Sequence, residues 1–590
     1  VYKRQFTSFF GTPGLGSPII RGFAENSSSR TLVLVDGLPV ARPDLGVAPW
    51  FQFPVNSLER VTLLRGSRTV RYGSRALGGV IAMETRRPTH KPSATAEIAA
   101  GGFETFRFRI FGGMPVRDWG LTLSAEDERS DGYRDNSAYR TTAGTIALES
   151  PQDAPLSARW TLSANDLFYE NPGALSTARY HEDPTQSIYE VFGVGDQYFN
   201  EIESLRATQQ LHWDLHPELG LDLDGSFFDR QRELNFGAGS VTDNDLRAWH
   251  LESILTWERD ATTLQAGVRG HSDDLDLTRY ADLERKKPFG RADLQRDLVG
   301  LFLIGRYEVA PAWSLTGGAG WEHYRLKAED RGRRFLPGFP LNYAEETSDD
   351  GLSFEASLQY EDARDRSAWL RYDRVYRFPV MDEIAAYQGF LLTEPFNAEL
   401  EPERGHNVEA GARWTPGDWE LGVTAFSLWL NGEIAYDFEQ NLNVNFADTH
   451  RYGLETQVAW DRDQWRLRLF HAATFAHYTS GPYDGRRIPL VPRHTLSGSV
   501  TWSPLASLAL SLEGRYVGSS PEGNDFANTE PSLPAHEVFN TQIRWFPDEQ
   551  VELFFRVNNL FDRRYASLKY LGQWYPAPGR QFIAGARIRF

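Results

Sequence analysis

The last ten residues of the chain, Q-F-I-A-G-A-R-I-R-F (581–590), alternate between two kinds of side chain. One set of alternate positions is entirely apolar and consists of Phe582, Ala584, Ala586, Ile588 and Phe590. The other set is mostly polar and consists of Gln581, Ile583, Gly585, Arg587 and Arg589. Because successive side chains of a β-strand point to opposite faces, this period of two predicts a strand with one apolar and one wet face.

The same alternation recurs along most of the chain, including residues 104–110, 465–475, 507–517 and 551–558. Many of these runs reach about 10–15 residues, which fits the ~9–11 of a tilted strand that crosses a bilayer. Strands of soluble sandwiches are usually shorter, at ~5–6 residues. A large soluble all-β protein is the alternative, but strands of this kind would expose too much apolar surface to water.

The connections between these runs alternate in length. Residues 415–418 and 503–506 are short polar turns, whereas long polar stretches occupy 170–202, 275–296, 329–350, 378–404 and 519–534. Short turns on one side and long loops on the other are typical of outer-membrane barrels. We therefore predict an all-β transmembrane barrel of about 22 antiparallel strands over residues 94–590.

The composition excludes several classes of protein. The 590 residues contain no cysteine, which excludes disulfide scaffolds, thiolate zinc sites and a cysteine nucleophile. The net charge of −18 argues against nucleic acid as a partner, because phosphate binding needs a basic face. No apolar run approaches the ~18 residues of a transmembrane helix. At roughly 150 residues per domain the length suggests about four soluble domains, but no boundaries between such units are visible.

Residues 1–93 differ from the rest and read as a small α/β unit. They contain, in order, I-R-G-F (20–23), L-V-D-G-L-P (34–39), S-L-E-R-V-T-L-L-R-G (57–66) and Y-G-S-R-A-L-G-G-V-I (72–81). This ordered set resembles the plug domain of TonB-dependent outer-membrane receptors. The resemblance implies that residues 1–93 form a plug inside the lumen of the barrel of residues 94–590.

The barrel half resembles the same family. N-A-E-L-E-P-E (397–403), I-P-L-V-P-R-H (488–494) and V-N-N-L-F-D-R-R-Y (557–565) are similar to its barrel motifs, although Ala398 stands where the family often has proline. The chain ends in Phe590, and the resemblance implies that this aromatic terminus is part of the signal for barrel assembly.

The resemblance also implies a set of ion pairs between plug and barrel. By motif, the plug arginines Arg21 and Arg65 would meet the barrel carboxylates Glu409 and Glu455. Charges in a partly desolvated interface need partners, so such pairs would hold the plug in register. The alternative is that each of the four is a solvated charge.

Ligand contacts are expected from the plug apex and the long loops. The candidates are Arg42 and Trp50 in the plug and Asn171, Arg179, Tyr180 and His181 in the first long loop. Each could equally be an ordinary loop residue. His181 with Glu182 and Asp183 lacks a third ligand of metal-site spacing, so we predict no metal site.

The resemblance implies a function in transport. A receptor of this kind in the cell outer membrane would bind a scarce ligand, most often a ferric siderophore, and import it with energy from the TonB-ExbB-ExbD complex. Cobalamin, another cofactor, haem or an oligosaccharide are alternative ligands, and a passive porin is the alternative class. We expect no resident cofactor (iron only within a transported chelate), no catalytic residues and a monomer in contact with lipid and lipopolysaccharide. The sequence carries neither a G-x-S-x-G elbow nor an H-E-x-x-H motif of enzymes.

Only 19 residues precede I-R-G-F, and none of them reads as the segment that TonB binds in this family. There is also no initiator Met and no signal peptide. We therefore expect that Val1 is not the native start and that part of the plug is missing.

Overall fold

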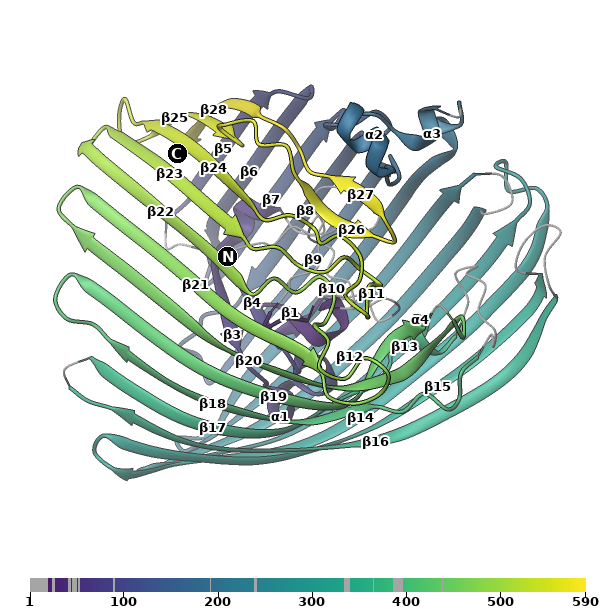
Figure 1. Ribbon diagram of the computed structural model, residues 1–590. Coiled ribbons are helices and arrows are strands. Elements are labelled where there is room, and N and C mark those ends of the chain that lie inside the picture. Colours follow the sequence, from purple (N-terminus) through teal and green to yellow (C-terminus); the bar gives the residue numbers. More distant parts are fainter. Residues whose placement is uncertain are drawn as a thin grey trace.

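The alternating runs form a closed barrel of 22 strands, as the sequence predicts (Figure 1). The structure is a computed structural model, and it describes residues 20–590 except 24–26, 41–43, 45–49, 51–53, 89–90, 192, 238–240, 334–339, 364, 386–395 and 438. Every neighbouring pair in the barrel is antiparallel, and the ring closes where β28 (Gln581–Arg589) pairs with β5 (Ser93–Gly101). Closure leaves no sheet edge exposed to lipid, where an unpaired backbone would be costly.

The strands of the first half of the barrel lengthen progressively. They are β6 (Thr105–Val116), β7 (Trp119–Ser130), β8 (Tyr139–Glu149), β9 (Leu156–Glu170), β10 (Tyr198–His216), β11 (Leu219–Phe236), β12 (Val241–Arg259), β13 (Thr262–Tyr280), β14 (Pro288–Ala310), β15 (Trp313–Arg333) and β16 (Pro340–Glu361).

The second half returns toward shorter strands. They are β17 (Arg366–Arg377), β18 (Glu403–Trp414), β19 (Trp419–Asp437), β20 (Leu442–Arg462), β21 (Trp465–Tyr478), β22 (His494–Leu505), β23 (Leu508–Val517), β24 (His536–Trp545) and β25 (Val551–Asn558). A separate hairpin of β26 (Ala566–Tyr570) and β27 (Gln573–Pro576) lies in the last long connection.

The plug lies inside the ring of strands, drawn in purple in Figure 1. It is a four-stranded sheet in the order β2-β1-β4-β3, made of β1 (Thr31–Val35), β2 (Leu38–Pro39), β3 (Leu58–Arg65) and β4 (Gly79–Thr85). A one-turn helix, α1 (Thr69–Tyr72), follows β3. The sheet has its own small apolar core, in which Val33, Val35 and Ile81 are buried.

The other helices are short and lie in the long loops. They are α2 (Thr177–Glu182), α3 (Ile188–Val191) and α4 (Met381–Ile384). None of the helices in the described residues has the length and apolar character needed to cross a membrane.

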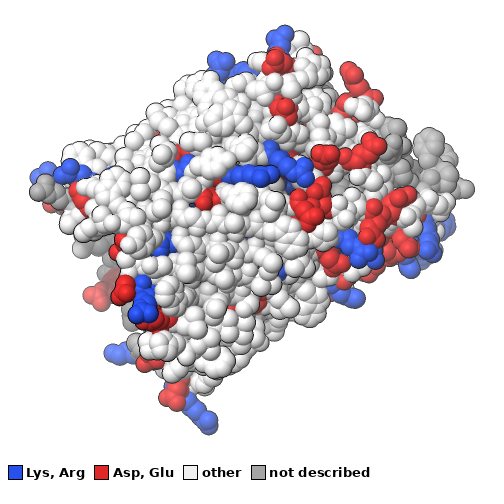
Figure 2. Space-filling model, turned by 90° about the horizontal axis from the view of Figure 1, so that it is seen from below, with Lys and Arg blue, Asp and Glu red and all other residues white. Residues whose placement is uncertain are grey.

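The outer surface of the barrel is apolar in its middle. Leu301, Leu303 and Val268 are about half-exposed there and face outward. Near the short turns, tryptophans stack across neighbouring strands, as in the pairs Trp419–Trp460 and Trp465–Trp502. In Figure 2 the central surface is mostly white, and acidic side chains are densest toward one end. An apolar band bordered by aromatic side chains is the surface that a bilayer requires.

Two of the long loops expected from the sequence are wrong. Most of 275–296 and 329–350 continues the strands β13 to β16, which rise well beyond the apolar band. At this height the polarity of the wall is reversed, because Asp274 and Asp276 face outward while Leu275 and Leu277 are buried inside. The inward leucines belong to an apolar cluster with the segments 378–385 and 396–400, which fold into the barrel mouth. Strands with acidic outer faces therefore read as polar loops in the sequence.

Candidate functional site

Arg21 connects the plug to two strands of the barrel wall. Its Nη2 lies 2.6 Å from Glu409 Oε2 on β18 and 3.4 Å from Glu455 Oε2 on β20. All three side chains are buried. Burial alone would lower the pKa of Arg21, but the charges of Glu455 and Glu409 raise it, so the guanidinium stays charged.

The neighbours of this pair fix its geometry. Trp369 Nε1 donates to the second carboxylate oxygen of Glu409 at 2.9 Å, and the Phe426 ring lies 4.5 Å from the Arg21 guanidinium carbon. Gly66 has φ +75°, and a Cβ there would lie 2.6 Å from Glu409 Oε2. The glycine of L-L-R-G thus leaves the space that the carboxylate occupies.

Arg65 is more loosely attached than Arg21. Its Nη1 lies 3.9 Å from Glu455 Oε2, and its side chain is 26% exposed. Its guanidinium also lies over the Phe470 ring, 4.2 Å from the centroid. Burial lowers the pKa of Arg65, with the charge of Glu455 opposing this. The structure therefore brings all four expected residues together, and their function as a lock stays a prediction.

The two arginines should contribute unequally to stability. We expect Arg65→Gln to reduce the free energy of unfolding by less than about 1 kcal/mol, because the pair is long and partly solvated. Arg21→Gln should reduce it by about 2 kcal/mol, since it leaves two buried carboxylates side by side. Urea titrations of the two variants in detergent micelles would measure this difference, and equal losses would contradict the unequal geometry.

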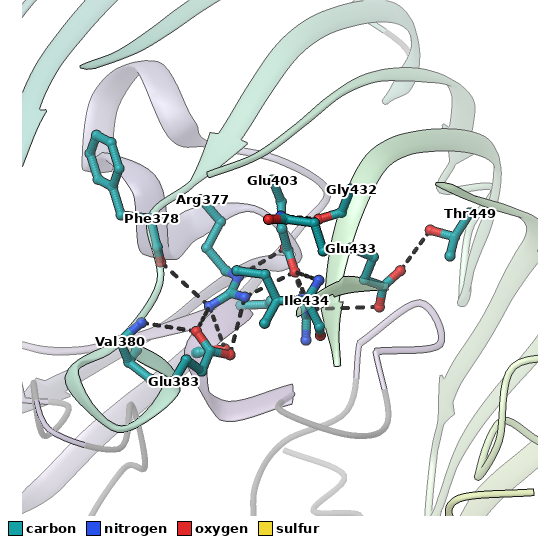
Figure 3. A network of polar contacts seen from close by, with 12 residues as sticks. Arg377, Phe378, Val380, Glu383, Glu403, Gly432, Glu433, Ile434 and Thr449 are labelled. Atoms are coloured by element: carbon teal, nitrogen blue, oxygen red, sulfur yellow. Dashed lines mark hydrogen bonds and ion pairs between the residues drawn. The ribbon is translucent and has the colours of Figure 1, made fainter. Parts of the chain in front are cut away.

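A second, larger ion network joins the plug to the wall and was not predicted from the sequence (Figure 3). Glu403, at the start of β18, accepts from Arg377 Nε at 2.8 Å and Nη2 at 2.9 Å. It also accepts from Arg30 of the plug, whose Nε lies 3.1 Å from Oε2. The amide of Ile434 adds a fourth direction at 2.8 Å. Glu403 is fully buried, so its charge depends on these donors.

The network continues to both sides of Glu403. Arg377 also pairs with Glu383 of α4 at 2.8 Å and donates to Ser29 Oγ of the plug at 3.2 Å. On the other side, Arg451 pairs with Glu433 at 2.7 Å and donates to the backbone oxygen of Gly22 at 3.3 Å. One continuous set of bonds therefore links an inward-folded extracellular loop, the wall and the plug.

Sequence reasoning had one signal for this network. Glu403 is the last residue of N-A-E-L-E-P-E, which was noted only as a family motif. Nothing in the local sequence distinguishes Arg377, Glu383 or Glu433 from other strand or loop charges. Their partners lie tens to hundreds of residues away, so only the closed barrel brings them together.

A third attachment holds the turn after α1. Glu322 of β15 accepts from the Ser74 amide at 2.9 Å and from the Tyr376 hydroxyl at 2.7 Å. Arg269 of β13 donates to the backbone oxygens of Val70 and Arg71, each at 3.0 Å. The Y-G-S segment of the plug is thus read by the wall mainly through its backbone.

The expected ligand residues of the first long loop divide into two groups. Asn171 and Tyr180 are buried at 2% and 5% exposure. Asn171 Oδ1 accepts from the Gly173 amide at 3.0 Å, and Tyr180 stacks on Trp574 of β27 with ring centroids 4.5 Å apart. Arg179 is half-buried and bonded to Gln186, and His181 is exposed. The buried pair supports the loop in this structure, and ligand contact stays a prediction for all four.

The remaining sequence candidates lie elsewhere. Trp50 is half-buried against the plug core beside Val33 and Ile81, and Arg42 lies outside the described residues. Phe590 sits at the barrel seam, where its amide and carbonyl bond to Ala94, and its ring is 71% exposed. Within the part of the chain that the structure describes, no group of three or more His, Cys, Asp or Glu is placed to hold a metal ion.

Comparisons with known proteins agree with this architecture. Residues 92–560 match the family model of the TonB-dependent receptor-like β-barrel, and residues 4–80 match that of the TonB-dependent receptor plug domain. The vitamin B12 transporter BtuB of Vibrio cholerae is 22% identical over 99% of this chain and 88% of its own length. The metal-pseudopaline receptor CntO of Pseudomonas aeruginosa is 24% identical over 89% of this chain and 78% of its own length.

Solved structures share the fold. The ferric yersiniabactin uptake receptor FyuA from Yersinia pestis superposes with a TM-score of 0.83 at 18% identity, covering 98% of this chain and 92% of that one. The barrel model alone spans most of the chain, and the barrel and its internal plug agree with it. The chain belongs to the TonB-dependent receptors, a family of outer-membrane transport proteins.

Proposed function

We propose that this receptor imports a ferric siderophore into the periplasm with energy from the TonB-ExbB-ExbD complex. The observation that supports an energised receptor over a passive porin is the bonded path from extracellular loop to plug. Glu383 of the inward-folded loop, Arg377, Glu403 and Arg30 form one chain of ion pairs. A ligand that moves the loop would shift this network and thereby the plug, which is a coupling between two sites.

The ligand class is supported by a basic loop in an otherwise acidic protein. Arg486 and Arg493 are exposed and Arg487 is half-buried in the connection between β21 and β22. The same connection reaches the plug, because Val491 Cγ1 lies 3.2 Å from a Cβ placed on Gly22. Aromatic side chains of this region, Tyr483 and Phe526, lie beside it with centroids 5.8 Å apart. Positive and aromatic groups together suit an anionic iron chelate.

Cobalamin is the second candidate, because one relative that aligns with almost the whole chain is named a vitamin B12 transporter. Titration of the purified receptor with a panel of ferric chelates and cyanocobalamin, followed by tryptophan fluorescence, separates the two. We expect a ferric siderophore to bind and the double variant Arg487→Gln/Arg493→Gln to weaken binding by roughly tenfold or more, since charge-assisted bonds contribute about 1.5–3 kcal/mol each.

Arg466→Gln is a suitable control, because Arg466 is equally exposed but lies at the opposite end of β21. Binding of cyanocobalamin without binding of any ferric chelate would contradict the siderophore proposal. Uptake that persists in cells lacking TonB would overturn the receptor mechanism itself.

The proposal includes the surroundings of the barrel. We propose a monomer without a resident cofactor, in which iron enters only within the transported chelate. The outward-facing Asp245, Asp276 and Asp293 lie opposite one another on β12, β13 and β14. Above the apolar band, such a row would meet lipopolysaccharide through divalent ions, because like charges in direct register need a counter-charge.

A further inference from the structure

A cavity of about 40 Å³ lies between the plug and the inner wall of strands β10 to β14. The plug contributes Pro39, Val40 and Arg75 to its lining. The charged and titratable residues from the wall are Arg206, His250, His271, Asp273 and Arg296. Its volume suits roughly three waters or one small anion of that size. It lies at mid-height of the strands, away from the extracellular loops.

The lining carries more positive than negative charge. Three guanidiniums line the cavity, but Asp273 is the one carboxylate among the lining residues, all of which the structure describes. Asp273 Oδ2 accepts from Arg296 Nε at 2.8 Å, and both side chains are buried. The charge of Arg296 is therefore balanced within the cavity wall.

The carboxylates around the cavity are also matched. Each has an arginine of its own within ion-pair distance, in the pairs Asp44–Arg230, Asp36–Arg159, Glu252–Arg71 and Glu322–Arg269. The guanidiniums of Arg75 and Arg206 thus add two positive charges to a set that is otherwise neutral. Net charge in a poorly solvated interface is unfavourable unless a counter-ion accompanies it.

The contacts of these two arginines do not supply that counter-charge. Arg206 Nη2 donates to the Pro39 carbonyl at 3.0 Å, and a carbonyl oxygen carries no formal charge. For Arg75, the nearby carboxylates Asp273 and Asp44 are shared with Arg296 and Arg230. Burial, and then the charge of Arg296, lower the pKa of Arg75 to about 10.

Two histidines complete the lining. His250 Nδ1 and His271 Nε2 lie 3.1 Å apart, on directly opposed positions of β12 and β13. A hydrogen bond between two imidazoles requires a donor and an acceptor, so at least one ring of the pair is neutral. The pair therefore brings polar N–H groups into the cavity without bringing negative charge.

We propose that this cavity binds one small inorganic anion, such as chloride or phosphate, between Arg75 of the plug and Arg206 and the His250–His271 pair of the wall. The anion neutralises the excess charge and fastens the plug to β10–β13. This site goes beyond the proposed transport function and does not depend on which ligand the receptor imports.

The test uses the full chain purified in detergent. Crystals soaked in sodium bromide should show an anomalous peak between Arg75, Arg206 and His250. In solution, the Tm of the wild type should rise when sodium phosphate replaces sodium gluconate at constant ionic strength. Arg206→Gln should lose this rise and, in gluconate, be no less stable than the wild type, because the substitution removes an excess charge.

Arg75→Gln tests the same site from the plug side, in case the wall variant does not fold. Arg247→Gln is the matched control, because Arg247 is exposed on the outer face of β12 and should leave the response to phosphate unchanged. A wild type without a bromide peak and without a response to phosphate would overturn the proposal. So would variants of Arg206 and Arg75 that respond as the wild type does.

Discussion

Replacing Glu403 by Gln should reduce the free energy of unfolding by about 3–5 kcal/mol, the usual cost of removing one partner from a buried ion pair. The substitution keeps the size of the side chain but removes the charge that Arg30 and Arg377 share. Both guanidiniums are almost fully buried, so water cannot replace the lost carboxylate. Of the network's three carboxylates, Glu383 and Glu433 would remain against three arginines.

The loss should appear in two measurements. The urea midpoint of the purified protein should fall, and planar bilayers should show current through barrels in which the plug has loosened, because Arg30 is the plug's member of the network. Glu401→Gln is the matched control, since Glu401 precedes Glu403 by two residues and its side chain is 74% exposed. A midpoint for Glu403→Gln equal to that of Glu401→Gln would refute the structural role of the network.

Gly73→Ala should cost about 3 kcal/mol, combining backbone strain with the loss of hydrogen bonds to a charged group. Gly73 has φ +79° and ψ −169°, a conformation that is essentially reserved for glycine. A Cβ there would lie 2.1 Å from Glu322 Oε1. Glu322 would have to move, and its bonds to the Ser74 amide and the Tyr376 hydroxyl would break.

Gly417→Ala separates the two causes of this loss. Gly417 also has a positive φ, +59°, but nothing lies within 4 Å of a Cβ placed there. It should cost about 1 kcal/mol, the price of a left-handed backbone alone. Urea titration of both variants checks the difference, and similar midpoints would show that the contact with Glu322 contributes nothing.

The second ion network gives the inward-folded loop a structural reason. Met381 and Ile384 of α4 are buried in the apolar cluster at the barrel mouth, so the loop is held by packing as well as by Glu383. The Asp382 amide also donates to the backbone oxygen of Asp44 in the plug at 3.3 Å. Loop and plug are therefore attached to each other directly and through the wall.

The sequence by itself determined the architecture. The period of two and the length of the runs predicted a barrel of about 22 strands, because both properties depend only on local chain geometry and on the thickness of the bilayer. The motifs I-R-G-F and L-L-R-G led to Arg21 and Arg65 and to their wall partners through a family resemblance. The structure places these residues within 4 Å of each other as ion pairs.

The tertiary structure alone decided which face of a strand is inside and which charges meet. Alternation in 274–277 has the same period in either orientation, and only the loop folded into the mouth makes Leu275 an inner and Asp276 an outer residue. The partners of Glu403 lie on the plug and on a neighbouring strand. Their pairing arises from closure of the ring around the plug, and closure is a long-range event that local periodicity does not encode.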